Sequence, residues 1–144
     1  MKKISEINSV TSHKVFLGGT CCKTTWRDTI MPKLKIQYFN PVVEDWTPEC
    51  IEEEYRQKNE LCDIHLYVLT PQLKGVFSIA ELIQSSLTEG KITVLYIMNT
   101  DKDDDSTWSK EMKSSLDEVS NLAETDGAII CTSLTNVVDT LNNL

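Results

Sequence analysis

The sequence predicts a three-layer α/β fold, in which a five-stranded parallel sheet lies between two layers of helices. Three observations support this prediction. Short apolar runs alternate along the chain with amphipathic segments, the connections between them are short, and 144 residues suit one domain with a single core. Because parallel strands are joined by crossover connections, usually helices, such alternation places helices on both faces of the sheet.

Five apolar runs have the length and composition of β-strands. They are residues 14–18, 35–39, 63–69, 92–98 and 127–131. The third run is the most apolar, so we expect it at the centre of the sheet, where both faces of a strand are buried. The expected strand order is 2-1-3-4-5, which is that of a flavodoxin-like three-layer sandwich.

An amphipathic segment follows each strand, and local signals mark several helix ends. The expected helices are residues 24–34, 48–61, 75–88, 108–123 and 134–144. Pro32 lies in the last turn of the first helix and helps to end it. Thr47-Pro48-Glu49 supplies the second helix with an N-cap, a proline at the first helical position and an early acid.

The composition limits the classes of partner. Acidic residues outnumber basic ones by 22 to 14, and the net charge of −8 argues against non-specific binding to nucleic acid, which depends on Lys and Arg. The first residues lack the apolar run of a signal peptide, and no run approaches membrane-spanning length. Five cysteines without a CxxC pair fit a reducing compartment. We expect one cytoplasmic domain over residues 1–144, with 1–12 as an N-terminal extension and neither nucleic acid nor membrane as partner.

Neither the acidic loop nor the histidines predict a metal site. Residues 101–112 begin like a calcium-binding loop, but Ser106 replaces the glycine at the sixth position and Met112 the acid at the twelfth. No Cys/His spacing matches a zinc site. His65 lies inside an apolar strand, where we expect a hydrogen-bonded core histidine.

The loops after the first four strands are expected to meet at one edge of the sheet and to form one crevice there. Gly18-Gly19, Asn40 and Asn99 lie in three of these loops, and the glycines would let the backbone approach a ligand closely. Trp26 and Trp46 flank the same edge and suit stacking on a flat base. The alternative is that both tryptophans only cover the edge of the sheet.

Glu81 lies in the first turns of the third helix, among apolar residues and next to the edge of the sheet where open α/β folds bind ligands. A carboxylate partly removed from water there could act as a nucleophile or as an acid/base group. The alternative is structural, because Ser78-Ile-Ala-Glu81 matches a capping box, in which the carboxylate would only bind a backbone N–H.

Several short motifs, taken together, resemble one family. They are Phe16-Leu-Gly-Gly-Thr20, Thr25-Trp-Arg27, Asn40-Pro41, Asp45-Trp46, Cys62-Asp-Ile64 and Gly75-Val-Phe-Ser-Ile-Ala-Glu81. Their order and spacing resemble the nucleoside 2-deoxyribosyltransferase-like family over about residues 14–98, and the remainder fits the last two βα units of that family.

The resemblance implies an enzyme that needs no cofactor. Glu81 would attack C1′ of a 2′-deoxynucleoside and form a glycosyl ester, which another base or water then resolves, while Asp63 would protonate or hold the departing base. The positions that would bind the substrate are Phe16, Gly18, Gly19, Trp26, Asn40, Asp45, Trp46, Lys74, Ser78 and Asn99. Relatives form oligomers, so we expect at least a homodimer, with Tyr55, Trp108 and Met112 as exposed candidate contacts.

Two departures from the family leave the substrate open. Many relatives carry a tyrosine where this chain has Phe16, and the transferases often carry an aspartate where it has Lys74. Lys74 with Ser78 could instead hold a 5′-phosphate, as in similar nucleotide N-hydrolases. Two further readings stay open: a non-catalytic binder of a nucleotide-derived ligand, and a TIR-like NAD glycohydrolase, which also uses a glutamate on a helix at the edge of a sheet.

Overall fold

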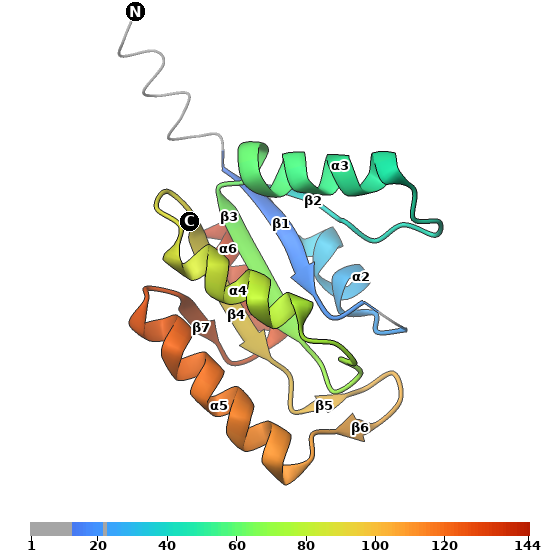
Figure 1. Ribbon diagram of the computed structural model, residues 1–144, viewed down its shortest axis with the longest axis vertical. Coiled ribbons are helices and arrows are strands. Elements are labelled where there is room, and N and C mark those ends of the chain that lie inside the picture. The colour runs from blue at the N-terminus through green and yellow to red at the C-terminus, as the bar shows by residue number, and fades with distance from the viewer. Residues whose placement is uncertain (1–12, 22) are drawn as a thin grey trace, which may run out of the picture.

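The computed structural model describes residues 13–21 and 23–144, so the expected extension at residues 1–12 and Cys22 lie outside the described residues. A five-stranded parallel sheet of order β2-β1-β3-β4-β7 forms the middle layer (Figure 1). The strands are β1 (Lys14–Gly19), β2 (Gln37–Phe39), β3 (Ile64–Leu69), β4 (Ile92–Ile97) and β7 (Ile129–Cys131). This confirms the predicted fold class and strand order, with the fully buried β3 at the centre.

Helices cover both faces of the sheet, and each layer of the core lies under one set of them. They are α2 (Trp26–Ile30) with the 3-10 turn η1 (Met31–Lys33), α3 (Pro48–Arg56) with the π-helical turn η2 (Gln57–Leu61), α4 (Phe77–Leu87), α5 (Lys110–Thr125) and α6 (Leu134–Asn142). In Figure 1, α3, α4 and α5 lie on one face, and α2 and α6 on the other. Within the described residues, no helix is both long and apolar enough to cross a bilayer.

The acidic loop after β4 contains a regular element that the sequence analysis did not predict. It contains a small antiparallel hairpin of β5 (Thr100–Asp101) and β6 (Ser106–Thr107). Asp105 adopts a left-handed conformation in its turn, with φ of 57°, which aspartate tolerates better than most residues. Strands of two residues have too few side chains to show an alternating pattern, so the sequence could not predict them.

Two of the apolar side chains expected on the surface are instead partly buried against the core. Trp108 and Met112 are partly buried against the core layer under α4 and α5, and Trp108 Nε1 donates a hydrogen bond to the Met98 carbonyl oxygen at 2.8 Å. The expected exposure of these two residues is therefore wrong. Tyr55 on α3 is 50% exposed, as expected.

The end of β1 needs glycine at two successive positions because it runs close to β3. The register places Gly18 beside Tyr67 and Gly19 beside Val68. A Cβ on Gly18 would lie 2.8 Å from Tyr67 Cε1. Gly19 has φ of 112°, and its Cβ would lie 2.1 Å from the Val68 carbonyl oxygen. The glycine pair thus lets two central strands approach each other at the carboxyl edge of the sheet.

Candidate active site

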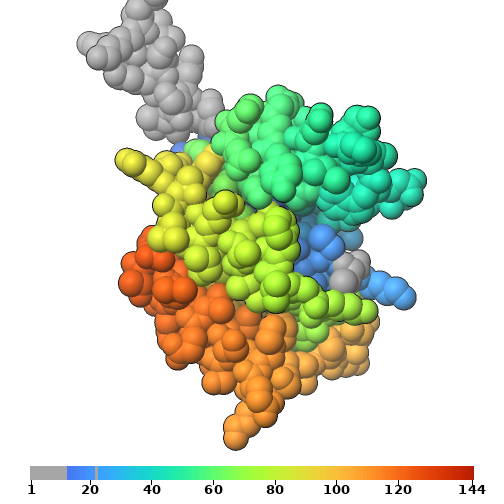
Figure 2. Space-filling model, viewed as in Figure 1, coloured from blue at the N-terminus to red at the C-terminus, as the bar shows by residue number. Residues whose placement is uncertain are grey.

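A cavity of about 340 Å³ opens beside the carboxyl end of β1, between α3 and α4. In Figure 2, blue atoms of the β1 region are visible in the hollow between α3 and the segment that leads into α4. Two glutamates, Glu54 from α3 and Glu81 from α4, line this cavity together with Lys58 from η2. Gly18, Gly19 and Phe16 line it from β1.

Glu81 faces this cavity as half of a buried ion pair. Its carboxylate Oε2 lies 2.6 Å from Lys58 Nζ, and the residues are 9% and 4% exposed. The N-cap of α4 is Val76, without a side-chain capping bond. The capping-box alternative is therefore wrong, and Ser78 lies inside the helix, where it also lines the cavity. The carboxylate of Glu81 is held by a cation beside an open space.

Glu54 is the second carboxylate in the cavity, and its environment differs from that of Glu81. Burial raises the pKa of the Glu54 carboxyl group, and the negative charge of Glu81 raises it further, against the smaller effects of Lys58 and Arg27. The sequence analysis missed Glu54 and Lys58. Their spacing of four residues places them on one helix face, but Glu54 ends a run of three glutamates, and nothing in the sequence distinguishes it from the other two.

Arg27 fixes the loop between β1 and α2 beside the cavity. It is 5% exposed, and its guanidinium donates to three backbone carbonyl oxygens, those of Leu17 at 3.0 Å, Gly19 at 3.3 Å and Thr20 at 2.8 Å. Burial lowers the pKa of the Arg27 guanidinium. Arg27 therefore holds the glycine turn in place with three of its five N–H donors and adds positive charge to the wall of the cavity.

Aromatic side chains surround the mouth of the cavity. Phe16 is buried at its base and stacks on Phe39, with ring centroids 5.9 Å apart. Trp46 and Phe77 line the cavity but remain 56% and 63% exposed. Flat, exposed rings next to two carboxylates can stack on an aromatic ligand without blocking access to the polar groups behind them.

Asp63 lies at the opposite edge of the sheet. Its carboxylate binds the His13 ring nitrogen Nδ1 and accepts a hydrogen bond from the Lys14 backbone N–H at 2.9 Å. The expectation that Asp63 faces the same cavity as Glu81 is wrong. The residue immediately precedes β3, and the start of a parallel strand lies at the edge away from the carboxyl ends.

The single crevice expected at the carboxyl edge is divided into two cavities by the sheet. Trp26 and Asn99 line a second cavity of about 650 Å³ on the face of α2 and α6. Trp26 is 2% exposed and belongs to the core on that face. It therefore covers the sheet, which is the alternative that the sequence left open for this residue. Asn40, Asp45 and Lys74 line neither cavity, although Pro41, next to Asn40, lines the one that holds Glu81.

A buried network of hydrogen bonds holds the backbone of Lys58 in place. His65 Nε2 lies 2.7 Å from the Lys58 carbonyl oxygen, and Nδ1 lies 2.8 Å from Ser85 Oγ, which lies 2.7 Å from Thr93 Oγ1. Because a carbonyl oxygen can only accept, Nε2 carries the proton and Nδ1 accepts from Ser85. This confirms the expected core histidine and ties η2 to β3, α4 and β4.

His65 should make the protein less stable in mild acid. Burial lowers the pKa of His65 from 6.5 to about 4, so between these values the unfolded chain binds a proton that the folded protein does not. The stability that neutral His65 contributes is complete above pH 6.5 and declines as the pH falls towards 4. A shift of this size corresponds to about 3 kcal/mol in the free energy of unfolding.

Urea unfolding at about pH 7 and about pH 4.5 measures this effect. We expect His65→Gln to lose clearly less stability over this interval than the unchanged protein does, whatever its stability at neutral pH. Equal losses in His65→Gln and in the unchanged protein would contradict the prediction.

The family of the chain follows from its sequence. No curated protein matches it significantly. The family model described as nucleoside 2-deoxyribosyltransferase like matches residues 12–100, a segment that contains Glu54, Lys58 and Glu81 and extends through β4. Because this match covers more than half of the chain, the protein belongs to the nucleoside 2-deoxyribosyltransferase-like family.

Proposed function

We propose that the protein cleaves the N-glycosidic bond of a 2′-deoxynucleoside or its 5′-monophosphate through a covalent glycosyl-Glu81 intermediate. One observation carries this proposal: Glu54 and Glu81 line one cavity in opposite electrostatic environments. Glu81 is paired with a cation, whereas burial and a neighbouring carboxylate raise the pKa of Glu54. A carboxylate paired with a cation, beside a carboxyl group whose pKa is raised, is the combination that glycosyl transfer with a nucleophile and a general acid uses.

The two carboxyl groups would act in sequence. A Glu81 carboxylate oxygen forms a bond to C1′, while the C1′–N bond breaks and its electron pair passes to the base. The base takes up the proton from Glu54, in the role that the sequence had assigned to Asp63. Another base or a water molecule then attacks C1′, and the electron pair of the ester bond returns to Glu81. In either case Glu54 accepts the proton that the attacking base or water loses, which restores its acid form.

The size and lining of the cavity suit such a substrate. Its volume of about 340 Å³ lies at the lower end of the range for small-molecule sites. Trp46 and Phe77 at the mouth provide faces on which a base can stack. Ser78, in the first turn of α4, offers a hydroxyl group to the sugar or to a 5′-phosphate.

A chromatographic assay of free base tests the proposal. We expect the protein to release base from at least one 2′-deoxynucleoside or monophosphate over time, and an added acceptor base to yield a new nucleoside if the reaction is a transfer. Binding without turnover, seen as a rise in Tm with one of these compounds but no free base, would contradict the enzymatic reading. Release of nicotinamide from NAD, with no base released from deoxynucleosides, would favour a glycohydrolase of NAD.

A further inference from the structure

Lys58 is a buried cation that lines one cavity together with two carboxyl groups. It contacts Glu81 directly, at 2.6 Å, and Glu54 precedes it by four residues on the same helical segment. All three line the same cavity, and the charges of both Lys58 and Glu81 act on Glu54. Lysine is rarely buried unless it is paired, so buried Lys58 depends on a carboxylate partner.

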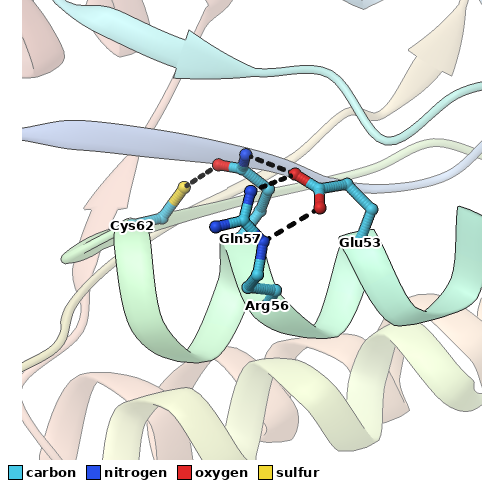
Figure 3. Close-up of polar contacts among 4 residues, drawn as sticks. All are labelled: Glu53, Arg56, Gln57 and Cys62. Atoms are coloured by element: carbon cyan, nitrogen blue, oxygen red, sulfur yellow. Dashed lines mark hydrogen bonds and ion pairs between the residues drawn. The ribbon is translucent and has the colours of Figure 1, made fainter.

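The fold holds the backbone of Lys58 in place, and the ion pair with Glu81 holds its ammonium group. Lys58 belongs to the π-helical turn η2, which is closed by a hydrogen bond from the Cys62 N–H to the Gln57 carbonyl oxygen at 2.7 Å. Figure 3 shows the Gln57 side chain between Glu53 and Cys62, with its Nε2 2.8 Å from Glu53 Oε1. His65 holds the Lys58 carbonyl group. The ammonium group itself contacts Glu81 and lies 5.2 Å from the centre of the Tyr55 ring.

During the proposed reaction the negative charge in the cavity moves from Glu81 to Glu54. When Glu81 forms the glycosyl ester it loses its negative charge, and Glu54 gains one when it gives its proton to the base. A cation that served Glu81 alone would then be buried without a partner, which is strongly unfavourable. An ammonium group on a long side chain, four residues after Glu54 and in the same cavity, can avoid this state by turning from Glu81 to Glu54, without any change in the net charge of the site.

We propose that Lys58 is a shared counter-charge, which pairs with Glu81 before the covalent step and with Glu54 while Glu81 is esterified. The proposal rests on the proposed function, but its central element is a property of the protein alone. Lys58 acts through Glu81, which it contacts, so it is a positioning residue. When the Glu81 ester bond is broken, the negative charge returns to Glu81, and the ammonium group of Lys58 pairs with Glu81 again.

Glu81→Gln imitates the uncharged ester, and this makes a test without substrate possible. The test is a double-mutant cycle of Lys58→Met and Glu54→Gln in which Tm is measured for each variant. The cycle is carried out twice, once in the unchanged protein and once in a protein that already carries Glu81→Gln. We expect the coupling between Lys58 and Glu54 to be small in the unchanged protein and to reach about 5 °C in Glu81→Gln. Equal coupling in both backgrounds would overturn the proposal.

Two further variants keep this test interpretable. Lys58→Met leaves the Glu81 carboxylate unpaired and could fail to fold, whereas Lys58→Gln in the same cycle keeps a hydrogen-bond donor for it and provides the comparison. Lys113→Met is the matched control, because its pair with Asp117 also measures 2.6 Å but is exposed. Lys113→Met should change Tm by the same amount with and without Glu81→Gln, because the Lys113–Asp117 pair lies on α5, away from the cavity.

The kinetic test separates this proposal from the proposed function. In a protein that releases base, we expect Lys58→Met to lower kcat by about 100-fold with KM within about threefold, and Lys58→Arg to recover part of the loss. If kcat of Lys58→Met lies within about threefold of the unchanged protein while Glu81→Gln is inactive, the proposal that Lys58 is a shared counter-charge is overturned. The proposed function is not affected by that result. An unchanged protein that releases no base would overturn the function, and the double-mutant cycle would still decide whether Lys58 is shared.

Discussion

Glu81→Gln is expected to lower the rate of base release from a 2′-deoxynucleoside by several orders of magnitude while the protein remains folded. Glutamine has nearly the shape of glutamate, and its carbonyl oxygen can still accept a hydrogen bond from the Lys58 ammonium group, 2.6 Å away in the ion pair. It cannot form the glycosyl ester, because an amide is a poor nucleophile. Chromatography of the free base gives the rate, and circular dichroism with thermal unfolding reports the fold.

The position of Glu81 in the cavity makes this substitution decisive. Glu89→Gln is a matched control, because Glu89 is exposed just beyond the end of α4 and should give the same rate as the unchanged protein. A Glu81→Gln rate within a few-fold of the control would exclude a covalent role for Glu81. The structural alternative has no support, since Glu81 makes no capping bond at the start of α4.

The sequence predicted the sheet because its signals are local. β3 is a continuous apolar run and lies at the centre, and Thr47 caps α3 as expected, with its hydroxyl oxygen accepting from the Cys50 N–H at 3.2 Å. The signals were weaker where elements are short. Pro32 lies in a 3-10 turn that follows α2, so the predicted first helix is shorter and changes type before its end.

The candidate site could be predicted only in part, because it depends on contacts between distant segments. The placement of Glu81 followed from the strand–loop–helix pattern around it. The ion pair with Lys58 joins residues 23 positions apart and depends on a π-helical turn, which has no sequence signature of its own. Asp63 could have been placed correctly from its position at the start of a strand, which is the edge opposite the ligand site.

Glu54→Gln is expected to show which carboxyl group protonates the departing base. Without the acid, release of a base that needs protonation should fall by about 10²- to 10⁴-fold. Release of a leaving group that is stable as an anion should fall far less, because it departs without a proton. In the unchanged protein, the raised pKa of Glu54 keeps its acid form present at a higher pH than usual. Base release should therefore decline as the pH rises through that pKa, and Glu54→Gln should lack this decline.

Asp63→Asn separates this assignment from the one that the sequence suggested. Asp63 binds His13 and Lys14 at the amino edge of the sheet, whereas Glu54 lines the cavity with Glu81, so we expect the loss of rate to follow Glu54. Glu52→Gln is the matched control on α3, because Glu52 is exposed and does not line the cavity. A large loss in Asp63→Asn, with Glu54→Gln close to the unchanged protein for a poor leaving group, would return the role of the acid to Asp63. The ratio of rates for the two kinds of leaving group makes the comparison independent of stability, since a partly unfolded variant loses both rates in equal proportion.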